Sequence, residues 1–146
     1  MSDSNYSSVA MLARFFTNGA LTTFTDTTGK VMTASGDAQV VTASAMLTGH
    51  ALQLDGSGDD LHMAGVAAFQ LGAASFTIDL ELSTTATAGC IAATAGATNW
   101  RLEVNGSGTL DVIFGGGIYK TSSVAINDGN KHHIAVVRSG SSTCYL

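Results

Sequence analysis

Residues 76–82 read Phe76-Thr77-Ile78-Asp79-Leu80-Glu81-Leu82 and alternate apolar and polar side chains throughout. Successive side chains of a β-strand point to opposite faces, so the four apolar residues share one face and the three polar residues share the other. This pattern is typical of a strand in an antiparallel sheet that has one buried and one solvated face. The stretch therefore predicts an antiparallel all-β fold.

Short strands separated by turns continue on both sides of this stretch. The segments 100–104 and 109–114 flank Asn105-Gly106-Ser107-Gly108, and this arrangement predicts a hairpin because Asn and Gly tolerate positive φ. A further strand is expected at 132–137, and the apolar run 9–16 is also interpreted as a strand. Many short strands of this kind predict an antiparallel β-sandwich or barrel. A chain of 146 residues has the usual length of one domain, so a single domain is predicted.

Composition excludes two classes of partner. The net charge is −5, and the six Lys and Arg residues are scattered singly, so the chain lacks the clustered cations that bind nucleic acid. No apolar run approaches the roughly 20 residues of a membrane span. The N-terminus is acidic and polar, which argues against a secretory signal. Only 12% of residues are charged, about half the usual share, and this suits a protein that packs against copies of itself.

Several segments together resemble a known family, the concanavalin A-like, laminin G-like jelly rolls. Residues 51–61 resemble its L-x-L-D-G-x-G-D-Y-L turn, residues 76–80 its F-T-I-E-x-W strand, and residues 128–137 its D-G-x-W-H-H-V-A-V-V strand. The opening segment, residues 7–40, is similar to the version of this domain common in tailed-bacteriophage virion proteins. The resemblance implies one laminin G-like jelly-roll β-sandwich over residues 1–146.

The chain departs from the family pattern at three places. Lys131 stands where the family usually has Trp, and Glu81 stands where the Trp of the other strand is expected. The family also continues with several more strands beyond Leu146. The expected fold is therefore a jelly roll that lacks its usual C-terminal strands. An unpaired strand invites a partner, so an assembly edge is predicted at the end of the chain. Its residues are Thr143, Cys144, Tyr145 and Leu146.

Three aspartates in a Gly-rich turn form a candidate Ca²⁺ site. Asp55, Asp59 and Asp60 could supply the clustered oxygen ligands that Ca²⁺ prefers, and some relatives of this fold bind Ca²⁺. The same residues also suit a purely conformational role, because Asp forms Asx-turns and Gly supplies positive φ. The conformational interpretation is favoured, and no other cofactor is expected.

Catalysis is not expected from this sequence. Glycosidases of the resembled fold carry E-x-D-x-E on one strand, and here Thr77 occupies the first position, before Asp79 and Glu81. No Ser in the chain stands in a G-x-S-x-G elbow. His132 and His133 are adjacent, so they point to opposite faces of their strand and cannot share a metal ion. The chain is therefore predicted not to be an enzyme.

The remaining candidates are aromatic residues and two cysteines. Trp100 and Tyr119 could stack on a sugar ring if they faced outward together, although alternation with Leu102 favours a core position for Trp100. Cys90 and Cys144 could form a disulfide only if their strands were neighbours, so the favoured interpretation is two small, buried or half-buried hydrophobic side chains.

Three functions are compatible with these observations. The first is a non-enzymatic virion structural protein, a capsid decoration or a part of a tail or fibre, that assembles with itself and with other virion proteins in the host cytoplasm. The second is a glycan-binding module for host or environmental carbohydrate. The third, a glycosidase, is least favoured because of Thr77. Fold alone does not decide among them.

Overall fold

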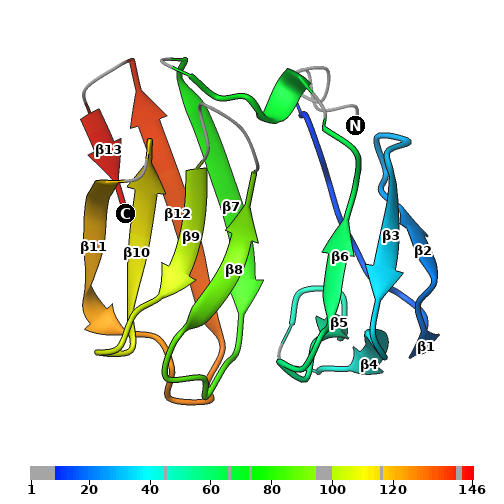
Figure 1. Ribbon diagram of the computed structural model, residues 1–146. Helices are drawn as coiled ribbons and strands as arrows, with labels where there is room; N and C mark the ends of the chain where they lie inside the picture. The colour runs from blue at the N-terminus through cyan, green and yellow to red at the C-terminus, as the bar shows by residue number, and fades with distance from the viewer. Residues whose placement is uncertain are drawn as a thin grey trace. The chain divides into compact units, whose positions relative to one another are not determined.

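The computed structural model describes residues 9–44, 46–65, 67–72, 74–94, 100–115, 117–140 and 143–146. The described chain is all-β, and its strand pairings are antiparallel, which confirms the predicted antiparallel all-β fold, whereas the jelly-roll topology stays a prediction (Figure 1). Contacts divide it into two compact units, residues 1–66 and residues 67–146. The single domain over residues 1–146 stays a prediction.

The first unit contains two small sheets of three strands each. One has the order β1-β4-β5 and the other the order β2-β3-β6. Among the described residues of this unit, the buried apolar side chains are Met32, Ala38 and Val40. Its strands are β1 (Gly19–Ala20), β2 (Thr23–Thr25), β3 (Val31–Ser35), β4 (Gln39–Thr42), β5 (His50–Gln53) and β6 (Asp60–His62).

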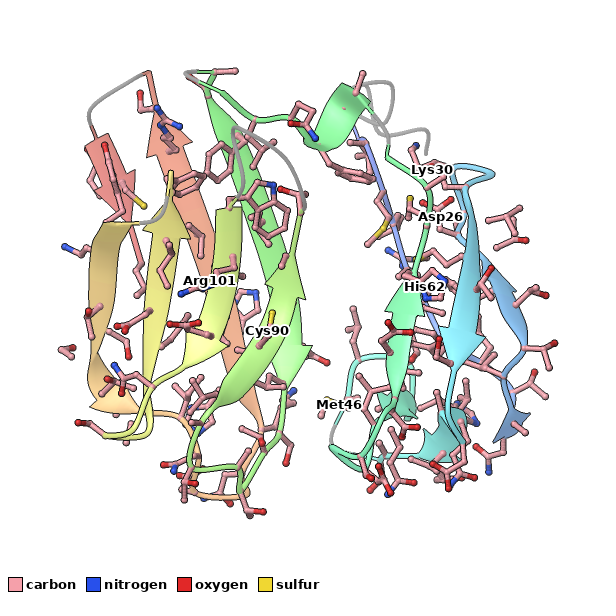
Figure 2. The ribbon with its side chains drawn as sticks, viewed as in Figure 1. Asp26, Lys30, Met46, His62, Cys90 and Arg101 are labelled. Carbon is pink, nitrogen blue, oxygen red and sulfur yellow. The ribbon has the colours of Figure 1, made fainter. Side chains whose placement is uncertain are left out.

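A buried carboxylate organises the loop between β2 and β3. Asp26 is 4% exposed and accepts hydrogen bonds from the backbone N–H groups of Leu12, Thr28 and Lys30 and from the Thr28 hydroxyl. Burial alone would raise the pKa of Asp26, but these donors outweigh it and lower the pKa. Asp26 and Lys30 are labelled in Figure 2.

The prediction of a strand at residues 9–16 was wrong. None of residues 9–16 lies in a strand, and the backbone of Leu12 donates to the Asp26 carboxylate at 2.9 Å and accepts from the Thr27 N–H at 3.1 Å. The backbone groups are thus satisfied by a loop and by its carboxylate, rather than by a neighbouring strand.

The second unit contains a four-stranded and a three-stranded sheet. Their orders are β11-β10-β9-β8 and β13-β12-β7, and the 3₁₀ turn η2 (Ala67–Phe69) precedes them. The predicted strands at 76–82, 100–104 and 109–114 are confirmed with the same bounds. The strands are β7 (Phe76–Leu82), β8 (Gly89–Ala93), β9 (Trp100–Val104), β10 (Thr109–Phe114), β11 (Gly117–Ala125), β12 (His132–Ser139) and β13 (Thr143–Tyr145).

One hydrophobic core joins the two sheets of the second unit in a sandwich-like packing. Leu102 and Val112 from the four-stranded sheet and Val136 from the three-stranded sheet are completely buried. The burial of each side chain of this size stabilises the folded state by about 1.5–3 kcal/mol. The apolar face of β7 packs against this same cluster, as the alternation of residues 76–82 predicts.

The predicted hairpin between β9 and β10 is held by the Asn105 side chain. Its Oδ1 accepts from the Ser107 N–H and the Thr109 hydroxyl, and its Nδ2 donates to Asp111. Gly108 has φ +76°, and a Cβ there would lie 2.2 Å from the Asn127 side chain. Glycine is therefore required at position 108 both by conformation and by space.

Arg138 closes one end of the second core. It follows Ile134 and Val136 on the inner face of β12 and is 7% exposed. Its guanidinium lies 5.3 Å from the ring centroid of Phe114 and 5.9 Å from that of Tyr119, and it donates to the Gly72 carbonyl at 2.5 Å. The strand pattern predicts an apolar side chain at position 138. The positive charge of Arg138 is stabilised there by the aromatic rings and by the Gly72 carbonyl.

Candidate functional site

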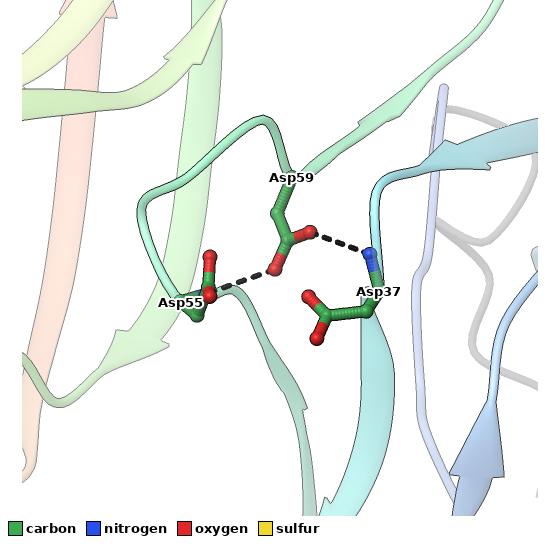
Figure 3. Close-up of side chains that lie close together, drawn as sticks. All are labelled: Asp37, Asp55 and Asp59. Carbon is green, nitrogen blue, oxygen red and sulfur yellow. Dashed lines mark hydrogen bonds between the residues drawn. The ribbon is translucent and has the colours of Figure 1, made fainter.

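Three carboxylates from two separated turns meet in the first unit. Asp37 lies in the turn between β3 and β4, and Asp55 and Asp59 lie in the loop between β5 and β6. One carboxylate oxygen from each lies within 4.8 Å of those from the other two (Figure 3). Within the described residues, this is the one group of three or more potential metal ligands.

Asp59 connects the two turns. Its carboxylate oxygens accept from the backbone N–H of Asp37 and from that of Asp55, each at 2.8 Å (Figure 3). Gly36 makes room for this contact, because a Cβ at that position would lie 2.1 Å from the Asp59 carboxylate. The sequence therefore needs glycine at position 36 for the acidic residues to approach each other.

The pKa values of two members of this group are shifted in opposite directions. Hydrogen bonds from the backbone N–H groups, that of Asp55 above all, lower the pKa of Asp59. The negative charges of Asp59 and then Asp55 raise the pKa of Asp37. The arrangement can share a proton at low pH, and its oxygen ligands are of the kind that Ca²⁺ prefers.

The predicted Ca²⁺ residues are only partly brought together. Asp55 and Asp59 belong to the carboxylate group, but Asp60 lies outside it. Asp60 starts β6 and accepts from His62 Nδ1 at 2.8 Å, and this hydrogen bond lowers the pKa of Asp60. Alternation explains the difference, because neighbouring residues of an extended chain point to opposite sides. Asp37 was missed, although Ser35-Gly36-Asp37 is readable as a turn in the sequence.

Two pairs of oppositely charged or polar side chains lie on the outer face of β7, with partners at positions 133 and 131. His133 bonds Asp79 at 2.9 Å, and Lys131 bonds Glu81 at 3.0 Å. The two positions that depart from the resembled family, 81 and 131, thus form an ion pair with each other. Nearby, hydrogen bonds from Asn130 and His132 lower the pKa of Asp128. The Asp79 and Glu81 carboxylates are therefore engaged with basic side chains on a solvated strand face.

Trp100 does not offer a sugar-stacking surface, which corrects the glycan prediction at this residue. It is 9% exposed, belongs to the core of the second unit and donates its indole N–H to the Phe69 carbonyl at 3.0 Å. Tyr119 is 38% exposed and packs edge-on against Phe114. The two aromatic residues therefore do not form one exposed platform.

Both cysteines are free thiols; Cys144 is half-buried as expected, whereas Cys90 is exposed, so the predicted burial was wrong for Cys90. Cys90 lies on β8, beside the strand that carries Arg101 (Figure 2), whereas Cys144 lies on β13 in the other sheet. Burial raises the pKa of each thiol. Neither cysteine is therefore activated as a thiolate nucleophile at neutral pH.

The predicted assembly edge forms a short strand. Residues 143–145 are β13, which pairs with β12 and lies beside β11. Tyr145 is 60% exposed and Leu146 is 40% exposed, while Cys144 packs partly against the core. An assembly role for this strand stays a prediction.

No protein-family model, curated protein or solved structure matches the chain. Across the described residues, no helix has the length and apolar character needed to cross a membrane.

Proposed function

We propose that this chain is a non-enzymatic structural component of a bacteriophage virion, either a capsid decoration protein or a part of a tail or fibre. It acts by assembling with copies of itself and with other virion proteins in the host cytoplasm. The proposal includes a concanavalin A-like, laminin G-like jelly roll as its fold. Support comes from the four resembling segments and from the character of the protein surface.

The observation that carries the proposal is the amount of exposed apolar surface. Twelve apolar residues are buried in the described chain, and nine large apolar residues are exposed. Single exposed apolar side chains are ordinary, but so many beside so small a core favour contact with other proteins. The exposed residues are Met11, Phe16, Val31, Leu47, Leu54, Tyr119, Val124, Tyr145 and Leu146.

The low charge of the chain agrees with this interpretation. Charged residues make up 12% of the sequence, so few surface charges need to be desolvated when two copies meet. Val31 is 59% exposed, Leu47 is 80% exposed and Val124 is 63% exposed. Covering such side chains contributes about 25 cal/mol per Å² of apolar surface removed from water.

Light scattering across a dilution series tests the assembly. We expect a trimer or larger species, and we expect Val31→Thr combined with Val124→Thr to weaken it, because these changes keep the branched shape and remove apolar surface. Thr23→Ser, on an exposed strand position, is the matched control. A 14.8 kDa monomer at every concentration would contradict the assembly proposal.

The virion location requires a second test. An antibody against the chain should label intact particles of the phage whose genome encodes it, and it should label them at regular positions on the capsid or tail. Absence of the chain from purified particles that contain their other structural proteins would contradict the location but not the assembly.

The glycan-binding module remains the second candidate. Of its two aromatic residues, Tyr119 retains partial exposure and Trp100 is in the core. A monomer that binds glycans on an array, and that loses binding in Tyr119→Ala, would favour this function over assembly.

A further inference from the structure

The two sheets of the second unit have four edge strands. These are β8 and β11 in one sheet and β7 and β13 in the other. An edge strand presents unpaired N–H and C=O groups, and proteins usually protect such edges with bulges, inward-pointing charges or a covering segment. The four edges can therefore be compared by the protection that each one carries.

Three of these edges show such protection. The pairing of β11 with β10 shifts register twice, and Lys120 lies opposite the core residue Val112, so a charge occupies an inward register position. The pairing of β8 with β9 shifts register between Cys90 and Ala92. The third, β13, lies beside β11.

In the described residues, the β7 edge has neither a bulge nor an inward-pointing charge. It pairs with β12 through seven consecutive residues, from Phe76 opposite Arg138 to Leu82 opposite His132, without a register shift. The chain contains no proline, and the inner positions of β7 are all apolar. In the described residues, no strand pairs with the other side of β7 (Figure 1).

The burial of the inner face also differs between β7 and its neighbour. On β12, Ile134 is 5% exposed and Val136 is fully buried. On β7, Ile78 and Leu80 occupy equivalent inner positions but are only partly buried. An additional strand beside β7 would cover these side chains, so the hydrophobic effect favours its addition.

The outer face of β7 indicates which side chains a new strand needs. Asp79 and Glu81 point outward, and they bond His133 of β12 and Lys131, the residue before β12. Asp79 keeps 62% of its side chain exposed after this pairing. Like charges directly opposite each other destabilise a sheet, which disfavours pairing β7 with the β7 of a second copy.

We propose that the free edge of β7 receives an extended segment of a partner protein. This segment has Lys or Arg at alternate positions, facing Asp79 and Glu81, and apolar residues at the positions between. Its backbone adds a strand to the sheet, and its cations select the carboxylate face. The inference rests on the proposed function, because it names the edge and the partner chemistry of that assembly.

Two synthetic strand peptides provide the test. Both have Val at alternate positions, and one has Lys and the other Glu at the positions between. With the full chain labelled for NMR, we expect the Lys peptide to slow amide exchange at the β7 residues whose N–H groups point away from β12. We expect the Glu peptide to bind about tenfold more weakly, because two cross-strand charge pairs change sign.

The variant Asp79→Asn with Glu81→Gln should remove most of this preference. Amide exchange along β12 is the control that the sheet remains folded in this variant. Equal binding of both peptides would overturn the proposal, as would protection at β8 or β11 instead of β7.

Two further outcomes would also overturn the proposal. If the edge-facing β7 amides are already protected in a peptide-free monomer, the chain covers this edge itself. If their protection grows with protein concentration alone, a second copy is the occupant. Light scattering of the peptide-free chain separates the two proposals, because an oligomer that binds neither peptide keeps the assembly function and rejects the β7 edge.

Discussion

The two units of the chain are stabilised in different ways. Among the described residues, the first buries three apolar side chains, those of Met32, Ala38 and Val40, whereas the second buries nine. In the first unit, individual carboxylates hold loops together through hydrogen bonds. Asp26 accepts from the backbone of Leu12 and Lys30, and Asp59 accepts from the backbone of two separate turns. The comparison shows that a β unit with little core can depend on hydrogen-bonded carboxylates, and its stability then depends on their ionisation.

The largest expected effect comes from the core of the second unit. Leu102→Ala leaves a cavity where the side chain is completely buried, and it should lower the free energy of unfolding by about 2–5 kcal/mol. Chemical denaturation measures the change. Leu47→Ala is the control, because Leu47 is 80% exposed and its change should stay within about 0.5 kcal/mol. Equal losses in both variants would contradict the assignment of the core.

A somewhat smaller effect is expected at the buried carboxylate of the first unit. Asp26→Asn removes a charged acceptor and should cost about 1–3 kcal/mol at neutral pH, measured from amide exchange in β2 and β3. The pKa of Asp26 is lowered below its usual 3.8, so its contribution is present above that pH and is lost as the pH falls through the folded-state pKa. A loss that is equally large in strong acid would contradict this account.

Arg138→Lys should lower the free energy of unfolding by about 1 kcal/mol, because a compact ammonium group makes poorer contacts with the faces of Phe114 and Tyr119 than a planar guanidinium does. Thermal unfolding of the second unit measures the change. Arg101→Lys, at an exposed position, is the matched control. Unchanged stability in Arg138→Lys would show that the aromatic contacts contribute little.

The smallest effect, with the opposite sign, is expected at Asp37. Its raised pKa means that ionised Asp37 is unfavourable in the folded state, so Asp37→Asn should stabilise the first unit at neutral pH. The advantage should disappear below pH 3.8, where the wild-type side chain is protonated in both states. Asp59→Asn should destabilise the unit instead, because it weakens the acceptor of two backbone N–H groups. Destabilisation by both variants would contradict the electrostatic difference.

The sequence predicts the strands of the second unit better than the structure of the first unit. Alternation and turn chemistry are local signals, so β7, β9 and β10 were predicted with the bounds that the structure shows. In the first unit, residues 9–16 are apolar enough for a strand, but their hydrogen bonds go to a distant loop, which no local pattern reveals. Sequence therefore predicts strands well where a core fixes the buried face, and less well where polar contacts between loops decide the structure.

The candidate sites show the same limit. Asp55 and Asp59 are close in the sequence and were found together, whereas Asp37 reaches them only through the packing of two separate turns. Asp60 follows Asp59 directly, yet strand alternation sends it to His62. The ion pair between Lys131 and Glu81 was also not foreseen, although both residues had been noted separately as departures from the resembled family.

The most direct test of the account is native-state amide exchange on the full chain, measured at neutral pH and again well below pH 3.8. We expect β3, β4, β5 and β6 to lose protection in acid, while β9, β10 and β12 retain theirs, because one unit depends on ionised carboxylates and the other on an apolar core. Loss of protection in both units at the same pH, with the same free energy, would contradict this division.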